Sequence, residues 1–303
     1  MKEKKLDVAG FGALNLDRLY RVKRIAKKGE HMPILDATDS PGGSAANTVA
    51  GLARLGARCG FIGAVGDDAE GKIMLDDFKR YEVDTNGITV LKDAKTGIII
   101  GFVDSKGERT LYPYPGANSL LEWEDIDTSY AKKAKILHIT SFVDEKQMLL
   151  QKKLLSELED TKISFSPGDL YSNKGMKALM PFIKNSAVIF LNQTEAKELT
   201  NKKYKDACAK LIDKGAGIVA VTLGKRGSYV TDGKEEYESP AYKTKAVDTT
   251  GAGDAYAAGF LYQMLKEGTI AEAARYGNNA ASFCIRKPGA RCGLPCREDM
   301  DSF

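Results

Sequence analysis

The sequence predicts an α/β fold in which helices cover both faces of a mostly parallel central sheet. Short apolar runs alternate along the chain with stretches of helical periodicity, and this alternation is typical of a parallel sheet. The chain has 303 residues, of which 43% are hydrophobic, so it can bury a large core. No low-complexity linker or repeat divides the sequence, and we therefore expect one domain that spans residues 1–303.

Six apolar runs are predicted to form buried strands, and six periodic segments between them are predicted to form helices. The expected strands, in chain order, are Leu6–Phe11, Cys59–Val65, Ile136–Thr140, Ile163–Ser166, Ala187–Leu191 and Ile218–Leu223. The expected helices are Ser44–Leu55, Gly71–Tyr81, Lys146–Glu159, Lys174–Ile183, Thr194–Leu199 and Tyr204–Lys214.

Two segments interrupt this alternation and are predicted to form β hairpins. Residues 14–39 and 96–114 have an extended, alternating pattern, and a turn at 104–107 divides the second segment. The two segments are distant in sequence but alike in character, so we expect them to pair in one small sheet beside the core. Such a sheet is a candidate lid over a substrate.

Polar or glycine-rich turns follow three of the predicted strands. Asp169 comes after the strand at 163–166, Asn192 to Glu195 follow the next one, and Gly224 to Gly227 follow the last. Because open α/β sheets bind ligands beyond the carboxyl ends of their strands, we expect the site at this edge.

The run 251–254, Gly-Ala-Gly-Asp, stands where a helical pattern begins and carries the strongest chemical signal. Backbone N–H groups at a helix start have no partner within the helix, and together with the helix dipole they attract anions such as phosphate. A carboxylate at Asp254 would repel a phosphate unless it had a chemical role. The economical role is to take a proton from a hydroxyl that attacks the phosphate, which indicates a kinase. A plain helix cap at Asp254 is the alternative.

The composition excludes several other function classes. Lys and Arg number 45 against 41 Asp and Glu, and the charges are spread out without a long basic run. We therefore expect no nucleic-acid partner. No apolar stretch approaches the roughly 18 residues of a membrane helix, and we find no signal peptide, so no membrane is expected.

The cysteine and histidine counts indicate a cytoplasmic protein without a zinc centre. An odd number of scattered cysteines fits free thiols in a reducing compartment better than a disulfide framework. The only two histidines, His31 and His138, lie far apart in sequence. This argues against a zinc hydrolase or catalysis by histidine. The P-loop pattern of another nucleotide-binding class is absent.

Six motifs follow one another in the order found in a single family of kinases. They are Gly42-Gly43-Ser44-Ala45-Ala46-Asn47 with 52–56, 63–68 with Gly71, Gly116-Ala117-Asn118, Asn192 with Glu195, Thr222-Leu223-Gly224 with Gly227, and 248–254. On these motifs the chain resembles the ribokinase-like (PfkB-type) carbohydrate kinases. The resemblance implies a three-layer α/β/α sandwich with a small β lid. It also implies phosphorylation of an alcohol, usually a primary one, with ATP as co-substrate and Mg²⁺ as cofactor.

The resemblance also implies roles for individual residues. Asp254 matches the catalytic base, and Gly251, Ala252 and Gly253 match an anion hole whose N–H groups neutralise charge on the transferring phosphoryl group. Four residues match the acceptor pocket of the family. Asp17 would accept hydrogen bonds from hydroxyl groups, and the glycines would allow close approach of the sugar. These are Asp17, Gly42, Gly43 and Asn47.

On the nucleotide side the resemblance implies phosphate and base contacts from five residues. They are Asn192, Thr222, Gly224, Gly227 and Asn279. At the adenine, Asn278 is the alternative to Asn279, and the turn at 289–290 lies in the same segment. Glu195 matches the residue that organises Mg²⁺, and we expect it to act through water because Mg²⁺ keeps several waters. Asp248 and Thr250 match a loop that binds a monovalent cation such as K⁺ in some relatives.

The acceptor stays open among several candidates. We favour a sugar, with a ribonucleoside as a close alternative because Ser44 is small where many sugar kinases carry a basic or bulkier residue. Tyr112 and Tyr114 could stack on a nucleobase, although packing within the sheet is our preferred interpretation. A sugar-phosphate kinase would need basic residues at the pocket; we interpret Arg109 as exposed lid charge, with contact to a phosphorylated acceptor as its alternative.

Two further alternatives concern the protein as a whole. A non-catalytic sensor of sugar or nucleotide could use the same fold, although it need not keep a base at Asp254. A homodimer that forms through the lid is a further expectation.

Overall fold

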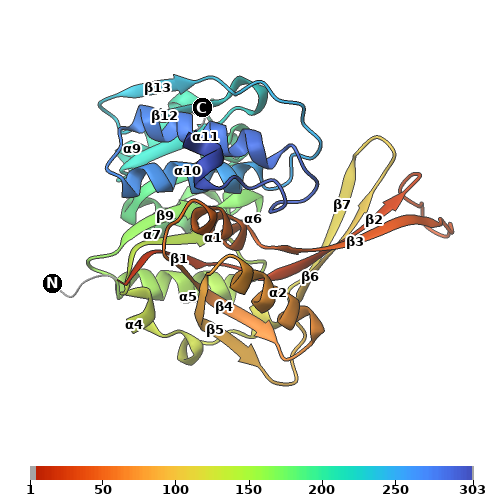
Figure 1. The fold of residues 1–303 in the computed structure, drawn as a ribbon. Helices are drawn as coiled ribbons and strands as arrows, with labels where there is room; N and C mark the ends of the chain where they lie inside the picture. The colour runs from red at the N-terminus through yellow and green to blue at the C-terminus, as the bar shows by residue number, and fades with distance from the viewer. Residues whose placement is uncertain (1–4, 302–303) are drawn as a thin grey trace.

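A nine-stranded sheet forms the centre of the protein, and a four-stranded sheet projects from one side of it (Figure 1). The computed structural model describes residues 5–301. The central strands run in the order β13-β12-β11-β10-β9-β8-β1-β4-β5. Their bounds are β1 Leu6–Phe11, β4 Cys59–Gly66, β5 Asp84–Leu91, β8 Ala134–Thr140, β9 Lys162–Ser166, β10 Ser186–Asn192, β11 Ile218–Thr222, β12 Ser228–Thr231 and β13 Glu236–Ser239.

The strands from β5 to β11 are parallel, and β12 and β13 add an antiparallel edge. All six predicted strands are present, within two residues at each end. Three strands escaped prediction. The strand β5 begins Asp-Thr-Asn-Gly and is only half-buried, so it has no apolar run, and β12 and β13 have four residues each.

Two apolar cores lie on the two faces of this sheet, because successive side chains of a strand point in opposite directions. Val8 and Val188 belong to one core, whereas their neighbours Ala9 and Ile189 belong to the other. One core is covered by α1 Ser44–Arg54, α2 Ala69–Arg80, α10 Ala252–Leu265, α11 Ile270–Cys284 and α12 Arg297–Asp301. The other is covered by α3 Ala117–Leu120, α4 Thr128–Ala131, α5 Glu145–Ser156, α6 Gly168–Ser172, α7 Gly175–Asn185, α8 Gln193–Thr200 and α9 Tyr204–Asp213.

The six predicted helices are present, and the long helix α11 is the main one that was missed. Its start carries a readable signal, since Thr269 caps the helix and Glu272 bonds back to the Thr269 backbone. This capping box could have located the helix. Two short 3₁₀ helices, η1 Trp123–Asp125 and η2 Gly224–Arg226, complete the described elements.

The projecting sheet confirms the predicted pairing of the two hairpins. Its strands run in the order β3-β2-β6-β7, with bounds β2 Asn15–Val22, β3 Ile34–Gly42, β6 Gly97–Val103 and β7 Arg109–Tyr114. The strand β3 continues three residues beyond the predicted end at Asp39, because Gly42 still pairs with Asn15. The lid strand therefore leads directly into α1, and the base of the lid adjoins the start of that helix. We call this sheet the lid.

Aromatic side chains hold the lid strands together. The ring of Phe102 on β6 lies 5.6 Å from that of Tyr20 on β2 and 6.3 Å from that of Tyr112 on β7, centroid to centroid. Such pairs stabilise neighbouring strands of a sheet. Tyr112 thus packs within the sheet, as preferred from the sequence.

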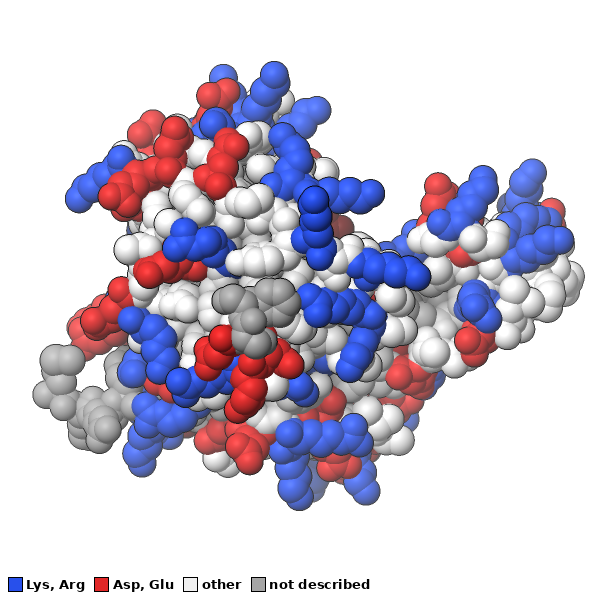
Figure 2. Space-filling view, turned by 45° about the horizontal axis from the view of Figure 1, so that its top comes forward, with Lys and Arg blue, Asp and Glu red and all other residues white. Residues whose placement is uncertain are grey.

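The surface carries charges of both signs. Figure 2 shows Lys and Arg interspersed with Asp and Glu over the body of the molecule and over the lid. Within residues 5–301, no helix is both long and apolar enough to span a bilayer.

Candidate active site

The first turn of α10 lies where the sequence predicted an anion site. Gly251 is the residue before the helix and has a φ of 76°, a left-handed conformation that favours glycine. A Cβ on Gly251 would lie 2.7 Å from the Cα of Ala290, so the fold itself requires this glycine. A Cβ on Gly253 would meet nothing within 4 Å. The fold therefore gives no reason for glycine at 253, and an approaching ligand would supply one.

Most of the N–H groups in this turn are free to bind an anion, but one already has an acceptor. Ala252, Gly253 and Asp254 occupy the first three helical positions, where an N–H has no acceptor within the helix. The N–H of Ala252 donates to the carbonyl of Thr249 at 3.2 Å, a bond that a phosphate would have to replace.

Two side chains of α1 hold the carboxylate of Asp254. The hydroxyl of Ser44 donates to Oδ1 at 2.7 Å, and Nδ2 of Asn47 donates to Oδ2 at 2.8 Å. Burial raises the pKa of Asp254 to about 6, although these two hydrogen bonds and the charge of Arg291 oppose the shift. A carboxyl group with this pKa is ionised at neutral pH and is a stronger base than an ordinary aspartate.

Ser44 was not expected to contact Asp254. The sequence analysis weighed it only for its small size after the paired glycines, whereas the structure places its hydroxyl on Asp254. The two residues are 210 positions apart, and only the packing of α1 against α10 brings them together. Asn47, predicted to line the acceptor pocket, also contacts Asp254.

Asp17 lies on β2 at the base of the lid and faces the same site. Burial raises its pKa to about 6, with a further increase from the charge of Asp254 and an opposing effect of Arg291 and Arg109. A Cβ on Gly42 would lie 2.4 Å from a carboxylate oxygen of Asp17, so glycine at 42 makes room for that carboxylate. Gly43 has a φ of 94°, and a Cβ there would lie 2.2 Å from the carbonyl oxygen of Ala13. The paired glycines thus have structural causes.

These pKa values predict a loss of activity in mild acid. A base must be unprotonated to accept a proton, so activity should fall as the pH drops through about 6, the value for Asp254. The charge of Asp254 also raises the pKa of Asp17, so protonation of Asp17 is expected in the same range. The check is the pH dependence of kcat/KM for the acceptor; a fall centred near pH 4, the ordinary range of aspartate, would contradict it.

Two of the predicted nucleotide residues lie side by side at the carboxyl edge of the central sheet. Asn192 at the end of β10 pairs directly with Thr222 at the end of β11. Asn192 caps α8 by accepting hydrogen bonds from the N–H groups of Thr194 and Glu195. Glu195 in turn accepts hydrogen bonds from the N–H and the Nδ2 of Asn192, at 2.9 and 2.8 Å. The pair is therefore held rigidly at the edge where Thr222 lies.

Glu195 stands among other acidic groups. Burial raises its pKa to about 7, with further increases from the charges of Asp169, Asp254 and Glu198 and an opposing bond from Asn192. A cation near these groups would stabilise their ionised forms. Among residues 5–301, no group of three or more His, Cys, Asp or Glu is placed to hold a metal alone. This donor set suits Mg²⁺, which takes few carboxylates and shares its other ligands with water and phosphate.

The remaining nucleotide candidates differ in accessibility. Gly224 has a φ of 59°, and a Cβ there would meet nothing within 4 Å. Gly227 has a φ of 96°, and a Cβ there would lie 1.9 Å from the carbonyl oxygen of Ser239, so the fold requires it. Asn279 is 4% exposed in α11. Its neighbour Asn278 ties α11 to Ser228 and to the carbonyl of Ser239. Contact of Asn279 with a nucleobase stays a prediction.

The loop before α10 is held by Asp248. Its two carboxylate oxygens accept hydrogen bonds from the N–H and hydroxyl of Thr250 and from the N–H of Gly289, at 2.7 to 2.9 Å. Burial alone would raise the pKa of Asp248, but these bonds hold it below its ordinary value. The carboxylate thus has a structural task, and a monovalent cation at this loop stays a prediction.

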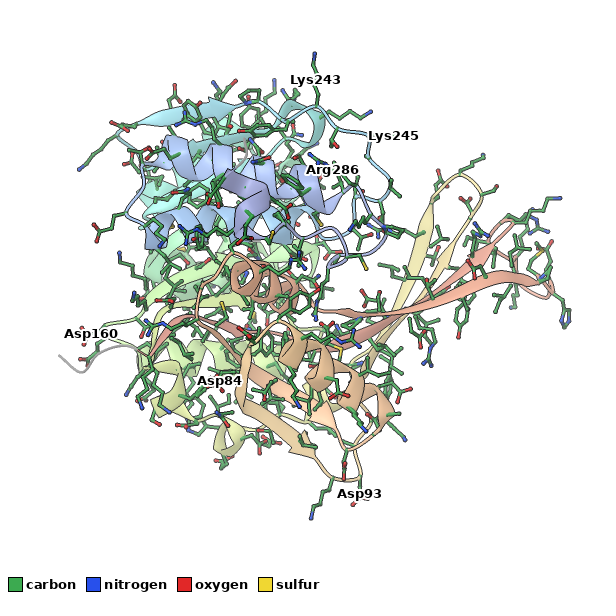
Figure 3. The ribbon with its side chains drawn as sticks, viewed as in Figure 1. Asp84, Asp93, Asp160, Lys243, Lys245 and Arg286 are labelled. Carbon is green, nitrogen blue, oxygen red and sulfur yellow. The ribbon has the colours of Figure 1, made fainter. Side chains whose placement is uncertain are left out.

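A second contact anchors the segment between β13 and α10. Arg286 donates a hydrogen bond to the hydroxyl of Thr244 at 3.1 Å, whereas Lys243 and Lys245 on the same segment extend outward (Figure 3). The segment that leads into the anion site is therefore tied to the end of α11.

Arg109 has a wider role than exposed lid charge. It is exposed at the start of β7, as expected, but its Nη1 also donates to the hydroxyl of Thr250 at 2.8 Å. Its charge lowers the pKa values of Asp17 and Asp248. A lid strand thus reaches the loop beside the anion site, a contact between residues 141 positions apart.

Known proteins resemble the chain over nearly its whole length. A family model described as pfkB family carbohydrate kinase matches residues 5–297. The chain is 39% identical over 248 residues to an uncharacterized sugar kinase of Archaeoglobus fulgidus, covering 81% of this chain and 98% of that protein. It is 31% identical to an ATP-dependent ribose-1-phosphate kinase of Halopiger xanaduensis, covering 98% and 97%. It is 30% identical to a ribokinase of Staphylococcus aureus, covering 96% and 97%.

Solved structures have the same fold. A ribokinase of Arabidopsis thaliana complexed with ribose and ATP superposes with a TM-score of 0.88 at 23% identity, covering 98% of both chains. An adenosine kinase of Sinorhizobium meliloti superposes with a TM-score of 0.83 at 26% identity, covering 96% of this chain and 97% of that one. The expected ribokinase-like sandwich with a separate small sheet is thereby confirmed.

Proposed function

The chain belongs to the pfkB family of carbohydrate kinases, and on this premise we propose that Asp254 is its general base in phosphoryl transfer from ATP to an alcohol. The relatives support an ATP-dependent sugar or nucleoside kinase. One observation supports the role of Asp254 above all others. Its carboxylate, with a pKa raised to about 6, lies in the first turn of α10, beside N–H groups that lack helical partners.

The proposed reaction uses few groups of the protein. The acceptor hydroxyl donates its proton to Asp254 while its oxygen bonds to the γ-phosphorus of ATP, and the bond from that phosphorus to the ADP oxygen breaks. The N–H groups of the proposed anion hole, Gly251 to Gly253, stabilise negative charge on the transferring group, and the N–H of Asp254 lies next to them in the same turn. Asp17 and Asn47 position the acceptor, and the lid excludes water so that the hydroxyl receives the phosphoryl group.

We propose further that Mg²⁺ is organised by Glu195, through water, with Asn192 beside it. Bound Mg²⁺ would neutralise charge on the ATP phosphates. Thr222, Gly224 and Gly227 border these phosphates in the proposal, and Asn279 lies toward the base. The loop of Asp248 and Thr250 is the proposed place for K⁺.

A screen for ADP release tests the activity and identifies the acceptor. Ribose, fructose, common ribonucleosides and pentose phosphates are each supplied with ATP and Mg²⁺, with and without K⁺. The proposal expects ADP release that requires one of these acceptors or a related polyol. Binding of ATP or sugar without any ADP release would favour a sensor instead.

A sugar phosphate is the second candidate acceptor, and Arg109 favours it. Its guanidinium reaches the loop beside the anion site, and it is a basic group presented by the lid. The relative from Halopiger xanaduensis, whose name gives ribose 1-phosphate as its substrate, is similar over 98% of this chain.

Replacing Arg109 separates the two acceptor classes. If the lid arginine binds the phosphate of the acceptor, Arg109→Met should raise KM for ribose 1-phosphate about 10- to 100-fold. This is the loss of affinity expected when one hydrogen bond between charged groups is removed. KM for an unphosphorylated sugar should change much less, because it loses only the effect of the Arg109 charge on Asp17. Steady-state kinetics with both acceptors make the comparison, with Arg24→Met at the lid tip as the control. Equal KM values for wild type and Arg109→Met would refute the role.

Three broader expectations complete the proposal. We propose one kinase domain over residues 1–303 and a cytoplasmic location, which five free cysteines support. We also propose a homodimer that forms through the lid, where Ile34, Leu35, Leu111 and Tyr112 are exposed. Light scattering on wild type and on a Leu35→Lys variant tests the dimer.

A further inference from the structure

One arginine is buried behind the acceptor pocket and connects three separate elements. Arg291 follows α11 and is only 5% exposed. Its Nε donates to Oδ1 of Asn47 at 2.9 Å, and its Nη2 donates to the carbonyl oxygen of Gly42 at 2.9 Å. Its Nη1 forms an ion pair with Asp77 of α2. The sequence had assigned the neighbouring turn at 289–290 to the adenine, whereas Arg291 lies on the acceptor side.

The contact with Asn47 decides how that amide is oriented. An asparagine amide can present either its oxygen or its NH₂ group to a given neighbour, and arginine can only donate. Nε of Arg291 donates to the amide oxygen of Asn47. The NH₂ group of Asn47 must therefore face Asp254, where it donates to Oδ2 at 2.8 Å. The opposite orientation would set an amide oxygen against a carboxylate.

The same guanidinium also affects the ionisation of the two carboxyl groups at the site. Its positive charge lowers the pKa values of both Asp17 and Asp254, against the larger effect of burial. Within residues 5–301, the charge of Asp254 also acts on three other titratable groups, which are Asp17 on β2, Glu195 on α8 and Cys284 on α11. All three become negative when they ionise. Arg291 is the cation that lowers the pKa of Asp254 itself, and Arg109 joins it in lowering that of Asp17.

We propose that Arg291 is a positioning residue that orients the Asn47 amide, and through it the carboxylate of Asp254, while holding the Gly42 carbonyl at the acceptor pocket. This rests on the proposed function of Asp254 and extends it to a residue outside the catalytic motif. A lysine could keep the charge but could not reach three partners at once, because only the guanidinium is a planar fork.

Kinetics of two substitutions test this role. Arg291→Met should lower kcat/KM for the acceptor about 100-fold, the effect of a small misplacement of a reacting group, and leave KM for ATP unchanged. The fall of kcat/KM in acid should also move to higher pH, because the opposing cation is gone. Arg291→Lys should restore the pH profile but only part of the kcat.

Two further variants distinguish a loss of positioning from a loss of stability. Loss of Arg291 leaves Asp77 buried without its ion partner, so the double variant Asp77→Asn with Arg291→Met removes that charge as well. Asp77→Asn alone should lower the melting temperature without moving the acid fall to higher pH. A folded double variant with wild-type kcat/KM and a wild-type pH profile would show that Arg291 is only structural.

The role of Asp254 and the role of Arg291 are tested by different variants, so either can be refuted alone. If Asp254→Asn retains turnover, the assignment of the base is wrong whatever Arg291 does. If Asp254→Asn is inactive while the double variant behaves like wild type, only the inference about Arg291 is wrong.

Discussion

Replacing Asp254 with asparagine is expected to lower kcat by about 10²- to 10⁴-fold, the usual contribution of a general base. The amide has nearly the shape of the carboxylate but cannot accept the proton of the acceptor hydroxyl. Binding of ATP should persist, since the proposed nucleotide residues Asn192 and Thr222 stand at the ends of β10 and β11 and are unchanged. Single-turnover phosphorylation measures the chemical step, and calorimetry measures the binding of ATP.

The asparagine variant needs a control for local disorder. Its NH₂ group would face either Ser44 or Asn47, both of which donate to Asp254 in the native protein, so some loss of stability is expected. Ser44→Ala removes one of these two hydrogen bonds but keeps the base, and it should retain much more activity than Asp254→Asn. Similar activities of the two variants would mean that geometry, and not proton transfer, limits the reaction.

Gly253→Ala is expected to abolish most activity while the protein remains as stable as wild type. The added methyl group meets no atom within 4 Å beyond its own turn of the helix, and alanine in a helix stabilises by up to about 1 kcal/mol relative to glycine. The methyl group would instead occupy space that a phosphate needs near the N–H groups. Alanine keeps the backbone N–H, but a phosphate held away from it loses that hydrogen bond, and such a loss typically costs about 10²- to 10³-fold in kcat.

Gly251→Ala is the control for Gly253→Ala, since it adds a methyl group to the other glycine of the same turn. There the methyl group would collide with Ala290, and the φ of 76° would be strained, so stability and activity should fall together. Thermal melting and ADP release are measured for both variants. A fully active Gly253→Ala would place the phosphate elsewhere and would undermine the proposed anion hole.

Local patterns were sufficient for much of the fold. The six apolar runs became β1, β4, β8, β9, β10 and β11, since each is buried on both faces and contains few polar residues. The ends of β10 and β11 place Asn192 beside Thr222, as parallel strands with one shared edge require. The strand β5 was missed because a half-buried edge strand has no continuous apolar run.

The contacts that tune the site could not be inferred in the same way. Ser44 and Asp254 are 210 positions apart, Arg109 and Thr250 are 141 apart, and Arg291 and Asn47 are 244 apart. No periodicity links such positions. Arg109 illustrates the difficulty, since an exposed lid arginine looks the same in sequence whether or not it reaches the anion site.

The run 251–254 by itself indicated an anion site at a helix start, because backbone N–H groups there lack helical partners. For Asp254 it left a plain helix cap as the alternative, and only the other motifs of the chain favoured a base. Which side chains hold Asp254 was decided only by the tertiary structure. The packing of α1 on α10 brings Ser44 and Asn47 to Asp254, and the turn after α11 brings Arg291 to Asn47. Helix starts arise from neighbouring residues, whereas these hydrogen bonds depend on how distant elements pack.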